Sequence, residues 1–353
     1  MIIIGVDAHK QVHVAVAIDD AGRELGHWKG PNSPQGWTDL QQWVGELGGD
    51  RRWGIEGAWN YGRGLAQHLV REGEGVWEVN PRWTAAGRRR GRKADKNDRL
   101  DARAVAILVR QEGAALPKVT ADDDCAVLDL LVTEREAALA EATRLRNQIH
   151  QLLLQVDPEY KLHMPKLNSR AGRAALQEFV ISSDDVLQRQ RVAAVRRLAQ
   201  RLELALDQSR ELARQIRDNA EQRFQLLTEI CGVNLLTAGA LAGILGPGRR
   251  FGTEAQLASY AGVAPLEASS AGLVRHRLNR GGNRRLNAIL YRIALTQTRY
   301  SPEARRYLER RQGEGKTRRE ALRALKRYIV RAIWRLWNQC KPAAGDEKLA
   351  AVA

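Results

Sequence analysis

The sequence predicts an α/β domain at the N-terminus, a helical coiled-coil region in the middle and a mainly α domain at the C-terminus. Three observations lead to this prediction: alternating strand-like and helix-like segments in the first 115 residues, a heptad pattern around residue 200, and very basic helical sequence after residue 283. At 353 residues, the chain is long enough for two hydrophobic cores and a connector. We place the three regions at residues 1–118, 119–224 and 225–345.

The first region alternates β-rich runs with helix-like segments. Three strands come first, separated by short turns, and each later strand is preceded by a helix. The resulting order, βββαβαβα, is that of a ribonuclease-H-like domain. The expected strands are residues 2–6, 12–18, 24–28, 53–56 and 76–79, and the expected helices are residues 33–47, 61–71 and 99–109.

Two long stretches of the middle region, residues 122–155 and 184–223, have helical character and little Gly or Pro. Apolar residues in the second stretch recur at spacings of three and four or their sums, which is typical of a coiled-coil seam. Between the stretches, Pro158, Pro165 and Gly172 predict a turn or a flexible loop. An antiparallel hairpin and an intermolecular coil both fit, and we favour a helical spacer that dimerises. The seam residues are Val195, Leu198, Leu202, Ala205, Leu212 and Ile216.

The C-terminal region begins with a sequence, residues 230–240, that resembles a helix-hairpin-helix element. Backbone amides at the helix N-terminus of such an element hold DNA phosphate without reading bases. Asn234 stands where the second glycine of this element is usual. Asparagine accepts a left-handed backbone better than most residues, so the element is still expected.

Helical sequence dominates the rest of this region. Thr253 and Gln256 form a capping box that predicts a short helix ending at Tyr260. A polar, Gly-rich stretch follows at residues 265–283, and very basic helices are expected at residues 284–337.

The net charge of +16 is concentrated in two blocks. Residues 81–103 contain 9 basic and 3 acidic residues, and residues 270–337 contain 19 basic and 4 acidic residues. Residues 1–80 instead contain 7 basic and 11 acidic residues. Local basic blocks indicate surfaces that face a polyanion, and the phosphate backbone of nucleic acid is the partner we expect.

The cysteines and the apolar runs exclude several classes of protein. Cys125, Cys231 and Cys340 lie far apart in helix-like sequence, which argues against a disulfide framework and against a zinc site. The N-terminal sequence lacks the features of a secretion signal. No apolar run approaches the roughly 20 residues that span a bilayer. We therefore expect a reduced, cytoplasmic protein with no membrane partner.

Four acidic residues have the spacing of a ribonuclease-H-like metal site. Asp7 and Glu56 each end a short apolar strand, and Asp98 and Asp101 share one face at the start of a helix. Such a cluster binds divalent ions that stabilise the attacking and leaving oxygens of phosphoryl transfer. Carboxylate oxygens suit Mg²⁺, and Mn²⁺ is a possible substitute.

Each of these residues also has a purely structural interpretation. Asp98 could be a helix N-cap, Asp101 a favourable charge in the first helical turn, and Asp7 the start of a turn. The combination of two strand-end carboxylates with a helical Asp-x-x-Asp, in this order, favours the metal site over these alternatives. Asp95 and Glu78 are nearby acidic residues that we rank below the four.

A dense basic run precedes the Asp pair. Basic side chains next to a carboxylate cluster would bring phosphates into a site that otherwise repels them. A solvated basic loop is the simpler alternative, but electrostatic docking of nucleic acid explains the position of the run better. The residues are Arg88, Arg89, Arg90, Arg92 and Lys93.

Motifs from both halves of the chain carry a family resemblance. They are Gly5-Val6-Asp7-Ala8-His9-Lys10, Ile55-Glu56-Gly57, Lys96-Asn97-Asp98-Arg99-Leu100-Asp101-Ala102-Arg103, and Gly262-Val263-Ala264-Pro265 with Ser269-Ser270. In this order they resemble the insertion-sequence one-ten transposase family. The resemblance covers residues 4 to about 337.

The resemblance implies a RuvC-like DEDD domain followed by a serine-bearing transposase domain. It assigns the four acidic positions to Asp7, Glu56, Asp98 and Asp101, and the nucleophilic serine to Ser270. It also implies exchange of strands between double-stranded donor and target DNA, guided by a structured "bridge" RNA, through a phosphoserine link. Serine and metal cluster would meet in a composite site built by different subunits of a tetramer. The expected assembly is a homodimer or homotetramer of a bacterial, nucleoid-associated protein.

The chain departs from the family pattern around the serine. Ala271 stands where a glycine commonly follows the serine, and Arg280 stands where lysine is usual. Ser269 therefore remains an alternative nucleophile. Arg275, Arg277 and Arg280 could hold the scissile phosphate or contact only the DNA backbone, and His276 is a candidate general base.

Two other functions fit the same residues. A RuvC-like metal-dependent nuclease or junction resolvase would hydrolyse DNA with water and use its C-terminal domain for binding alone. A non-catalytic nucleic-acid scaffold would need neither the carboxylates nor the serine. Substitution of Ser270 separates the recombinase from the nuclease, and substitution of Asp7 or Glu56 separates both from the scaffold.

Overall fold

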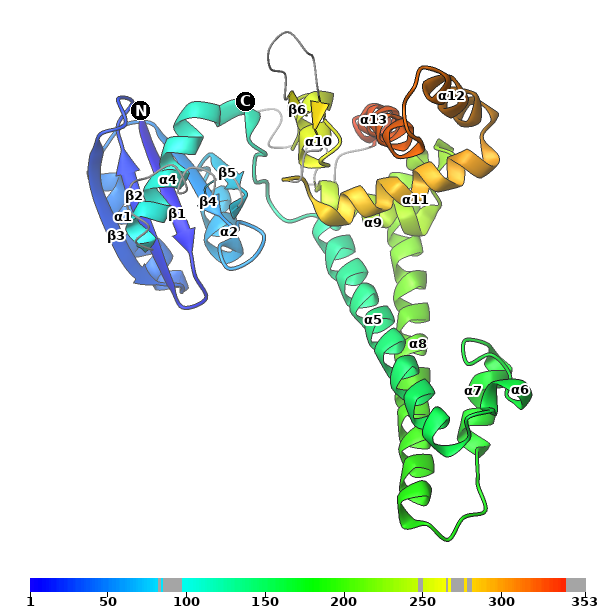
Figure 1. The fold of residues 1–353 in the computed structure, drawn as a ribbon. Helices are drawn as coiled ribbons and strands as arrows, with labels where there is room; N and C mark the ends of the chain where they lie inside the picture. The colour runs from blue at the N-terminus through cyan, green and yellow to red at the C-terminus, as the bar shows by residue number, and fades with distance from the viewer. Residues whose placement is uncertain are drawn as a thin grey trace. The chain divides into compact units, whose positions relative to one another are not determined.

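The computed structural model (Figure 1) describes residues 1–81, 84, 97–246, 250–264, 266–267, 276–277 and 281–340. Contacts divide the chain into two compact units. Unit 1 comprises Met1–Asp124, Leu226–Val233 and Ile244–Ala353, and unit 2 comprises Cys125–Gln225 and Asn234–Gly243. The acidic N-terminal region and the basic C-terminal region thus belong to the same unit.

A five-stranded mixed sheet forms the centre of the N-terminal region. β1 (Ile2–Ala8), β2 (Val12–Ile18) and β3 (Glu24–Pro31) are antiparallel neighbours. β4 (Arg51–Glu56) and β5 (Val76–Val79) extend the sheet parallel to β1, giving the order β3-β2-β1-β4-β5. The described elements follow the order expected from the sequence, with bounds that differ by at most three residues.

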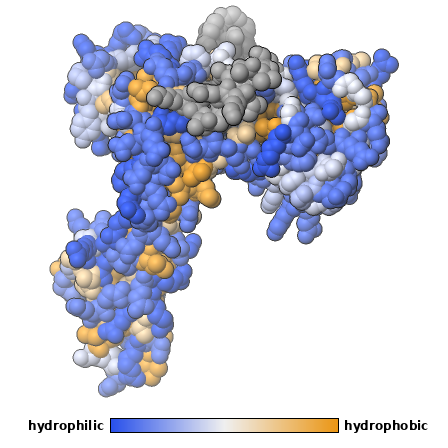
Figure 2. Space-filling view, turned by 180° about the vertical axis from the view of Figure 1, so that it is seen from behind, coloured by the Kyte–Doolittle hydropathy of each residue, from blue (hydrophilic) through white to orange (hydrophobic). Residues whose placement is uncertain are grey.

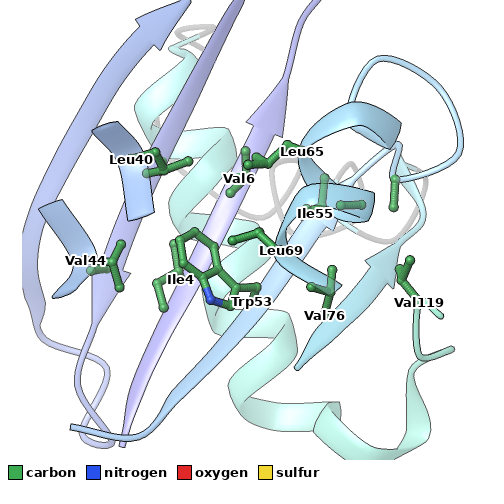
Figure 3. Close-up of a cluster of buried hydrophobic side chains, with 14 of the residues drawn as sticks. Ile4, Val6, Leu40, Val44, Trp53, Ile55, Leu65, Leu69, Val76 and Val119 are labelled. Carbon is green, nitrogen blue, oxygen red and sulfur yellow. The ribbon is translucent and has the colours of Figure 1, made fainter. Parts of the chain in front are cut away.

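Helices cover both faces of this sheet. α1 (Pro34–Glu46) and α2 (Arg63–Arg71) pack on one face, and α4 (Asp98–Glu112) packs on the other. Successive residues of β1 point to opposite faces. Ile4 contributes to the core under α1 and α2, which Figure 3 shows, and Ile3 contributes to the core under α4. The expected mixed α/β character of the N-terminal domain is confirmed.

Two glycines let α4 approach the sheet closely. Gly5 of β1 and Gly54 of β4 are register partners on neighbouring parallel strands. A Cβ atom on Gly5 would lie 2.2 Å from the carbonyl oxygen of Ala102, and one on Gly54 would lie 2.3 Å from a methyl group of Val109. Both clashes are with α4, so the helix rests directly on the backbone of the two strands.

Unit 2 is built on two long helices. α5 (Asp124–Val156) and α8 (Val186–Phe224) are connected by the short helices α6 (Tyr160–His163) and α7 (Arg170–Glu178). The two long helices run side by side in Figure 1 and share one hydrophobic core. The seam of α8 therefore faces α5 of the same chain, as in the hairpin alternative, and dimerisation stays a prediction. Core residues are Ala142, Leu145, Ile149 and Leu153 of α5 with Val195, Ala199, Leu202 and Ala205 of α8.

The segment around residues 157–173, predicted as a turn or loop, instead contains α6 and the start of α7. Ser169 caps α7, because its side chain accepts a hydrogen bond from the backbone N–H of Gly172 at 3.0 Å. Tyr160 of α6 and Leu176 of α7 are buried in the core of unit 2. Tertiary burial thus supports helices that are too short to be stable alone.

The face of the molecule drawn in Figure 2 is mainly hydrophilic, with scattered hydrophobic residues on unit 2. No helix of the described residues is both long enough and apolar enough to cross a membrane. Exposed hydrophobic residues of unit 2 include Leu130, Leu162, Val180, Val186, Leu187 and Leu204.

The C-terminal part of the chain is mostly helical, as the sequence predicts. The capping box of Thr253 and Gln256 is present, with hydrogen bonds in both directions. The helices are α9 (Leu235–Leu245), α10 (Glu254–Tyr260), α11 (Arg284–Tyr300), α12 (Pro302–Gly313) and α13 (Arg318–Trp337).

The predicted helix-hairpin-helix sequence contains a turn at Gly232, with a φ of 90°, before α9. Asn234 caps α9, because its side chain accepts a hydrogen bond from the backbone N–H of Thr237 at 2.9 Å. The role of asparagine at this position is therefore capping, for which its side chain is well suited. Phosphate binding by this element stays a prediction.

We expect Gly5→Ala to destabilise the N-terminal domain by about 1–3 kcal/mol, because the added methyl group overpacks the contact with α4. Gly45→Ala is the matched control. Gly45 lies in α1, and a Cβ atom there meets nothing closer than 3.8 Å, so alanine should stabilise the helix by roughly 0.5–1 kcal/mol. Urea unfolding of the two variants measures both effects. Equal stability of the variants would contradict the close approach of α4.

Candidate active site

Two neighbouring interior strands place two carboxylates side by side, near the carboxyl ends of the strands. Asp7 of β1 and Glu56 of β4 are register partners, as are Gly5 and Gly54 two residues earlier. Residues two apart on a strand point to the same face. Both carboxylates therefore emerge on the face that α4 covers.

The start of α4 brings the remaining two carboxylates to this face. Asn97 is the N-cap, and its side chain accepts a hydrogen bond from the backbone N–H of Arg99 at 2.9 Å. Asp98 is thus not needed as a cap, and its side chain is 45% exposed. Asp101, one turn further, is buried. The backbone amide of Asp101 donates to the carbonyl of Asn97, which is ordinary helix geometry.

His9 joins this cluster, although no role was expected for it from the sequence. Its Nε2 lies 3.1 Å from Oδ2 of Asp7 and 3.6 Å from Oδ1 of Asp98. Among the described residues, Asp7, His9 and Asp98 form a group whose ligand atoms all lie within 4.8 Å of one another. The sequence signals for His9 were its place in the Gly5-Val6-Asp7-Ala8-His9-Lys10 motif and its position two residues after a strand-end aspartate.

Glu56 and Asp101 extend this group. The Thr84 hydroxyl donates a hydrogen bond to Oε2 of Glu56 at 3.0 Å, which orients the carboxylate. The negative charges of Asp101 and Asp98 both act on Asp7. The structure therefore brings all four predicted carboxylates to one end of the α4-covered face.

Burial raises the pKa of Asp7 above its ordinary value of 3.8. The nearby charges of Asp101 and Asp98 raise the pKa further, and His9 opposes them. A buried carboxylate beside two others is unfavourable when ionised, and a bound cation relieves this repulsion.

The donor atoms fit a divalent metal ion. Carboxylate oxygens are the ligands that Mg²⁺ and Mn²⁺ prefer, and an imidazole nitrogen is better suited to Mn²⁺ than to Mg²⁺. Asp7, His9 and Asp98 would be the inner ligands, with Glu56 and Asp101 next to them.

Glu78, one of the two competing acidic residues, does not belong to this site. Glu78 of β5 is the register partner of Ile55, which lies in the core under α1 and α2. Its side chain therefore points to the face opposite α4. Asp95 lies outside the described residues.

The predicted basic and nucleophilic residues fall mostly outside the described part of the chain. His276 and Arg277 form β7, which pairs antiparallel with β6 (Leu266–Glu267). Residues 268–275 thus connect the two strands of a short ribbon, and Ser270 lies within this connection in the sequence. The residues outside the description are Arg88, Arg89, Arg90, Arg92, Lys93, Ser269, Ser270, Arg275 and Arg280.

Two segments that flank the ribbon in the sequence pack tightly against each other. They are residues 260–264 and 281–283, which we call the hairpin base. A Cβ atom on Gly282 would lie 2.2 Å from the amide nitrogen of Gly262, so the two segments touch along their backbones. The amide of Asn283 donates to the carbonyl of Tyr260 at 2.6 Å. Both ends of the serine-bearing segment are therefore fixed to each other.

Polar side chains of α11 and α13 support this base. Asn287 of α11 donates from Nδ2 to the carbonyl of Ala261 at 2.8 Å. The ammonium group of Lys326, which is buried on α13, donates to Oδ1 of Asn287 at 2.8 Å. The first turns of α11 and the middle of α13 thus hold the hairpin base in position.

Comparisons with known proteins identify the family. A family model described as "Transposase" matches residues 4–158, and a second, described as "Transposase IS116/IS110/IS902 family", matches residues 224–309. The chain is 30% identical to the 43.6 kDa protein of insertion element IS110 from Streptomyces coelicolor, over 68% of this chain and 70% of that protein. The chain belongs to the IS110 family of transposases. The expected resemblance is thereby confirmed.

Other relatives agree with this assignment. The 44.8 kDa protein of insertion element IS116 from Streptomyces clavuligerus is 25% identical over 94% of this chain and 93% of its own length. The transposase for insertion sequence element IS1328 from Yersinia enterocolitica is 24% identical over 65% of this chain and 66% of its own length. Among solved structures, T. thermophilus RuvC in complex with a Holliday junction substrate matches 34% of this chain and 99% of its own, with 11% identity and a TM-score of 0.28.

We expect Asp7→Asn to stabilise the metal-free protein by about 1 kcal/mol at pH 7, because it removes a buried, repelled charge. The raised pKa of Asp7 means that the folded state holds this proton more tightly than the unfolded state. The wild-type carboxylate therefore costs stability above pH 3.8, and the advantage of the variant should vanish below that pH. Unfolding in EDTA between pH 3 and 7 measures this difference.

Added Mn²⁺ should make the wild type more stable than Asp7→Asn, since the wild type gains stability by binding metal and the variant does not. Asp39→Asn is a control, because Asp39 is exposed on α1 and accepts a hydrogen bond from the side chain of Gln35 on the same helix. A wild-type protein that Mn²⁺ fails to stabilise would contradict the metal site.

Proposed function

We propose that this transposase cuts and exchanges DNA strands with a Mg²⁺-dependent carboxylate cluster and a serine nucleophile. The observation that carries the proposal is the in-register pair Asp7 and Glu56 facing the Asp98 and Asp101 turn of α4. Carboxylates from two parallel strands and one helix, converging on one point, are the arrangement that phosphoryl-transfer chemistry with divalent ions requires.

The chain's own residues have distinct roles in this proposal. Asp7, His9 and Asp98 hold the metal directly, and Glu56 and Asp101 complete the acidic cluster beside them. Divalent ions, when bound, would neutralise charge that develops on the phosphate during transfer. Thr84 fixes the orientation of Glu56 through its hydroxyl group.

Ser270 supplies the nucleophile in the proposed reaction. Its hydroxyl oxygen attacks phosphorus, the bond from phosphorus to the departing DNA oxygen breaks, and the released strand end takes up a proton. A hydroxyl group of the incoming strand then attacks the phosphoserine and releases the serine. Each step replaces one phosphoester bond with another, so the exchange needs no external energy source.

The partners of the reaction are part of the same proposal. Family membership supports double-stranded donor and target DNA as substrates, with a structured bridge RNA as guide and a homodimer or homotetramer as the working assembly. The composite site would combine the acidic cluster of one subunit with Ser270 of another. The concentration of basic residues in 270–337 suits binding of both nucleic acids.

We expect Ser270→Ala to abolish strand exchange and the covalent protein–DNA adduct, with a loss of at least about 10³-fold. Ser269→Ala is the matched control and should retain both. Denaturing gels of the protein with labelled donor DNA detect the adduct, and product sequencing detects exchange. Continued cutting by Ser270→Ala would favour the metal-dependent nuclease or junction resolvase. Loss of the adduct only in Ser269→Ala would identify Ser269 as the nucleophile.

We expect a discrete RNA to co-purify with the protein from cells that carry its flanking DNA, because the basic blocks need a polyanionic partner. Sequencing of the bound RNA should give one species with segments complementary to both donor and target. The same preparation treated with high salt is the control, since electrostatic binding weakens with ionic strength. The absence of a discrete species would overturn RNA guidance and leave the strand-transfer proposal intact.

A further inference from the structure

Arg250, in the segment before α10, is a buried cation in the part of unit 1 that precedes the hairpin base. Its side chain is 3% exposed. One terminal nitrogen donates to the carbonyls of Ile244 and Leu245, at 3.0 and 3.3 Å. The other pairs with the carboxylate of Glu78 on β5 and lies 3.4 Å from the hydroxyl group of Tyr260.

Aromatic rings complete the surroundings of this guanidinium group. Its central carbon lies 5.0 Å from the ring centres of Trp59 and Tyr260 and 5.2 Å from that of Phe251. A planar, weakly hydrated guanidinium is the cation that suits such an environment. Arg250 is therefore held on several sides by fixed partners.

On one side, these partners flank the acidic cluster. Trp59 follows Glu56 by three residues, and its indole N–H donates to Oε2 of Glu78 at 3.0 Å. Glu78 precedes Val79, which is the register partner of Glu56. Arg250 thus contacts both the turn that follows Glu56 and the strand β5, on the face of the sheet opposite α4.

On the other side, the same partners form the hairpin base. Tyr260 accepts a hydrogen bond from Nδ2 of Asn283 on its hydroxyl group, at 2.9 Å, and one from the amide of Asn283 on its carbonyl. Burial raises the pKa of Tyr260, so the phenol stays neutral at physiological pH. A continuous polar chain, Glu78, Arg250, Tyr260 and Asn283, therefore joins β5 to the base of the serine-bearing ribbon.

We propose that Arg250 is a positioning residue that fixes the base of the serine-bearing hairpin against the turn that follows Glu56. The inference rests on the proposed function of Ser270 and of the carboxylate cluster. With this link in place, each chain would present its acidic half-site and its serine half-site at a constant spacing to the other subunits. A small displacement of reacting groups is costly, because roughly 1 Å can reduce a rate by about 10²-fold.

The test uses the full-length protein, purified with the RNA it carries, and labelled donor DNA. Arg250→Lys keeps the charge and loses the planar fork, and Glu78→Gln keeps the shape and loses the charge. We expect each to slow adduct formation at saturating DNA and Mn²⁺ by at least about tenfold, while the affinities for DNA and Mn²⁺ change less than about twofold. The double variant should be no slower than the slower single variant, because both changes break one link.

Two further variants make the result decisive. Trp59→Phe removes the indole hydrogen bond to Glu78, keeps an aromatic ring beside Arg250, and remains available if Arg250→Lys fails to fold. Arg214→Lys with Glu211→Gln is the matched control, because this pair on α8 is exposed, and it should react like the wild type. Melting temperatures identify variants that are merely unstable.

The outcomes separate this inference from the proposed function. Folded Glu78→Gln and Trp59→Phe variants that form the adduct within about twofold of the wild-type rate would overturn the positioning role, as would single effects that multiply in the double variant. A wild-type protein that forms no adduct would overturn the proposed serine chemistry itself, and the inference with it.

Discussion

The direct contact of α4 with the backbones of β1 and β4 is the constraint on which the acidic site depends. A side chain at Gly5 or Gly54 would hold the helix away from the sheet. The first turn of α4 would then move away from the two strand ends, and Asp98 and Asp101 with it. The glycines are thus as important to the site as the carboxylates, although they lie two residues earlier on the same strands.

The carboxylates of the acidic site repel one another, and the fold compensates this repulsion only in part. Asp7 and Asp101 are buried, and burial together with the neighbouring charges raises the pKa of Asp7. His9 offsets part of this repulsion. Such a cluster of carboxylates lowers the stability of the fold when all of its members are ionised.

The buried charge of Arg250, unlike that of Asp7, is balanced by partners within the fold. Arg250 has a carboxylate, two carbonyls and aromatic rings as partners, so its charge is compensated within the fold. Removal of any one partner would leave a buried ion unsatisfied. The contacts of its two terminal nitrogens make the guanidinium group a specific connection between β5 and the hairpin base.

Local signals in the sequence determined most of the secondary structure and the identity of the acidic cluster. Strand-end carboxylates, the helical Asp-x-x-Asp and the capping box at Thr253 are set by residues close together in the chain, so short-range chemistry predicts them. The helices α6 and α7 were missed because their stability comes from burial of Tyr160 and Leu176 in the core of unit 2.

Only the tertiary structure decided which residues meet across long separations. It added His9 to the cluster, turned Glu78 away from it, and paired Glu78 with Arg250, 172 residues later in the chain. Strand register and the packing of α4 fix these choices, and both depend on how distant segments fill one core. The sequence by itself therefore determined which chemical groups the protein carries, and the packed fold decided which of them act together.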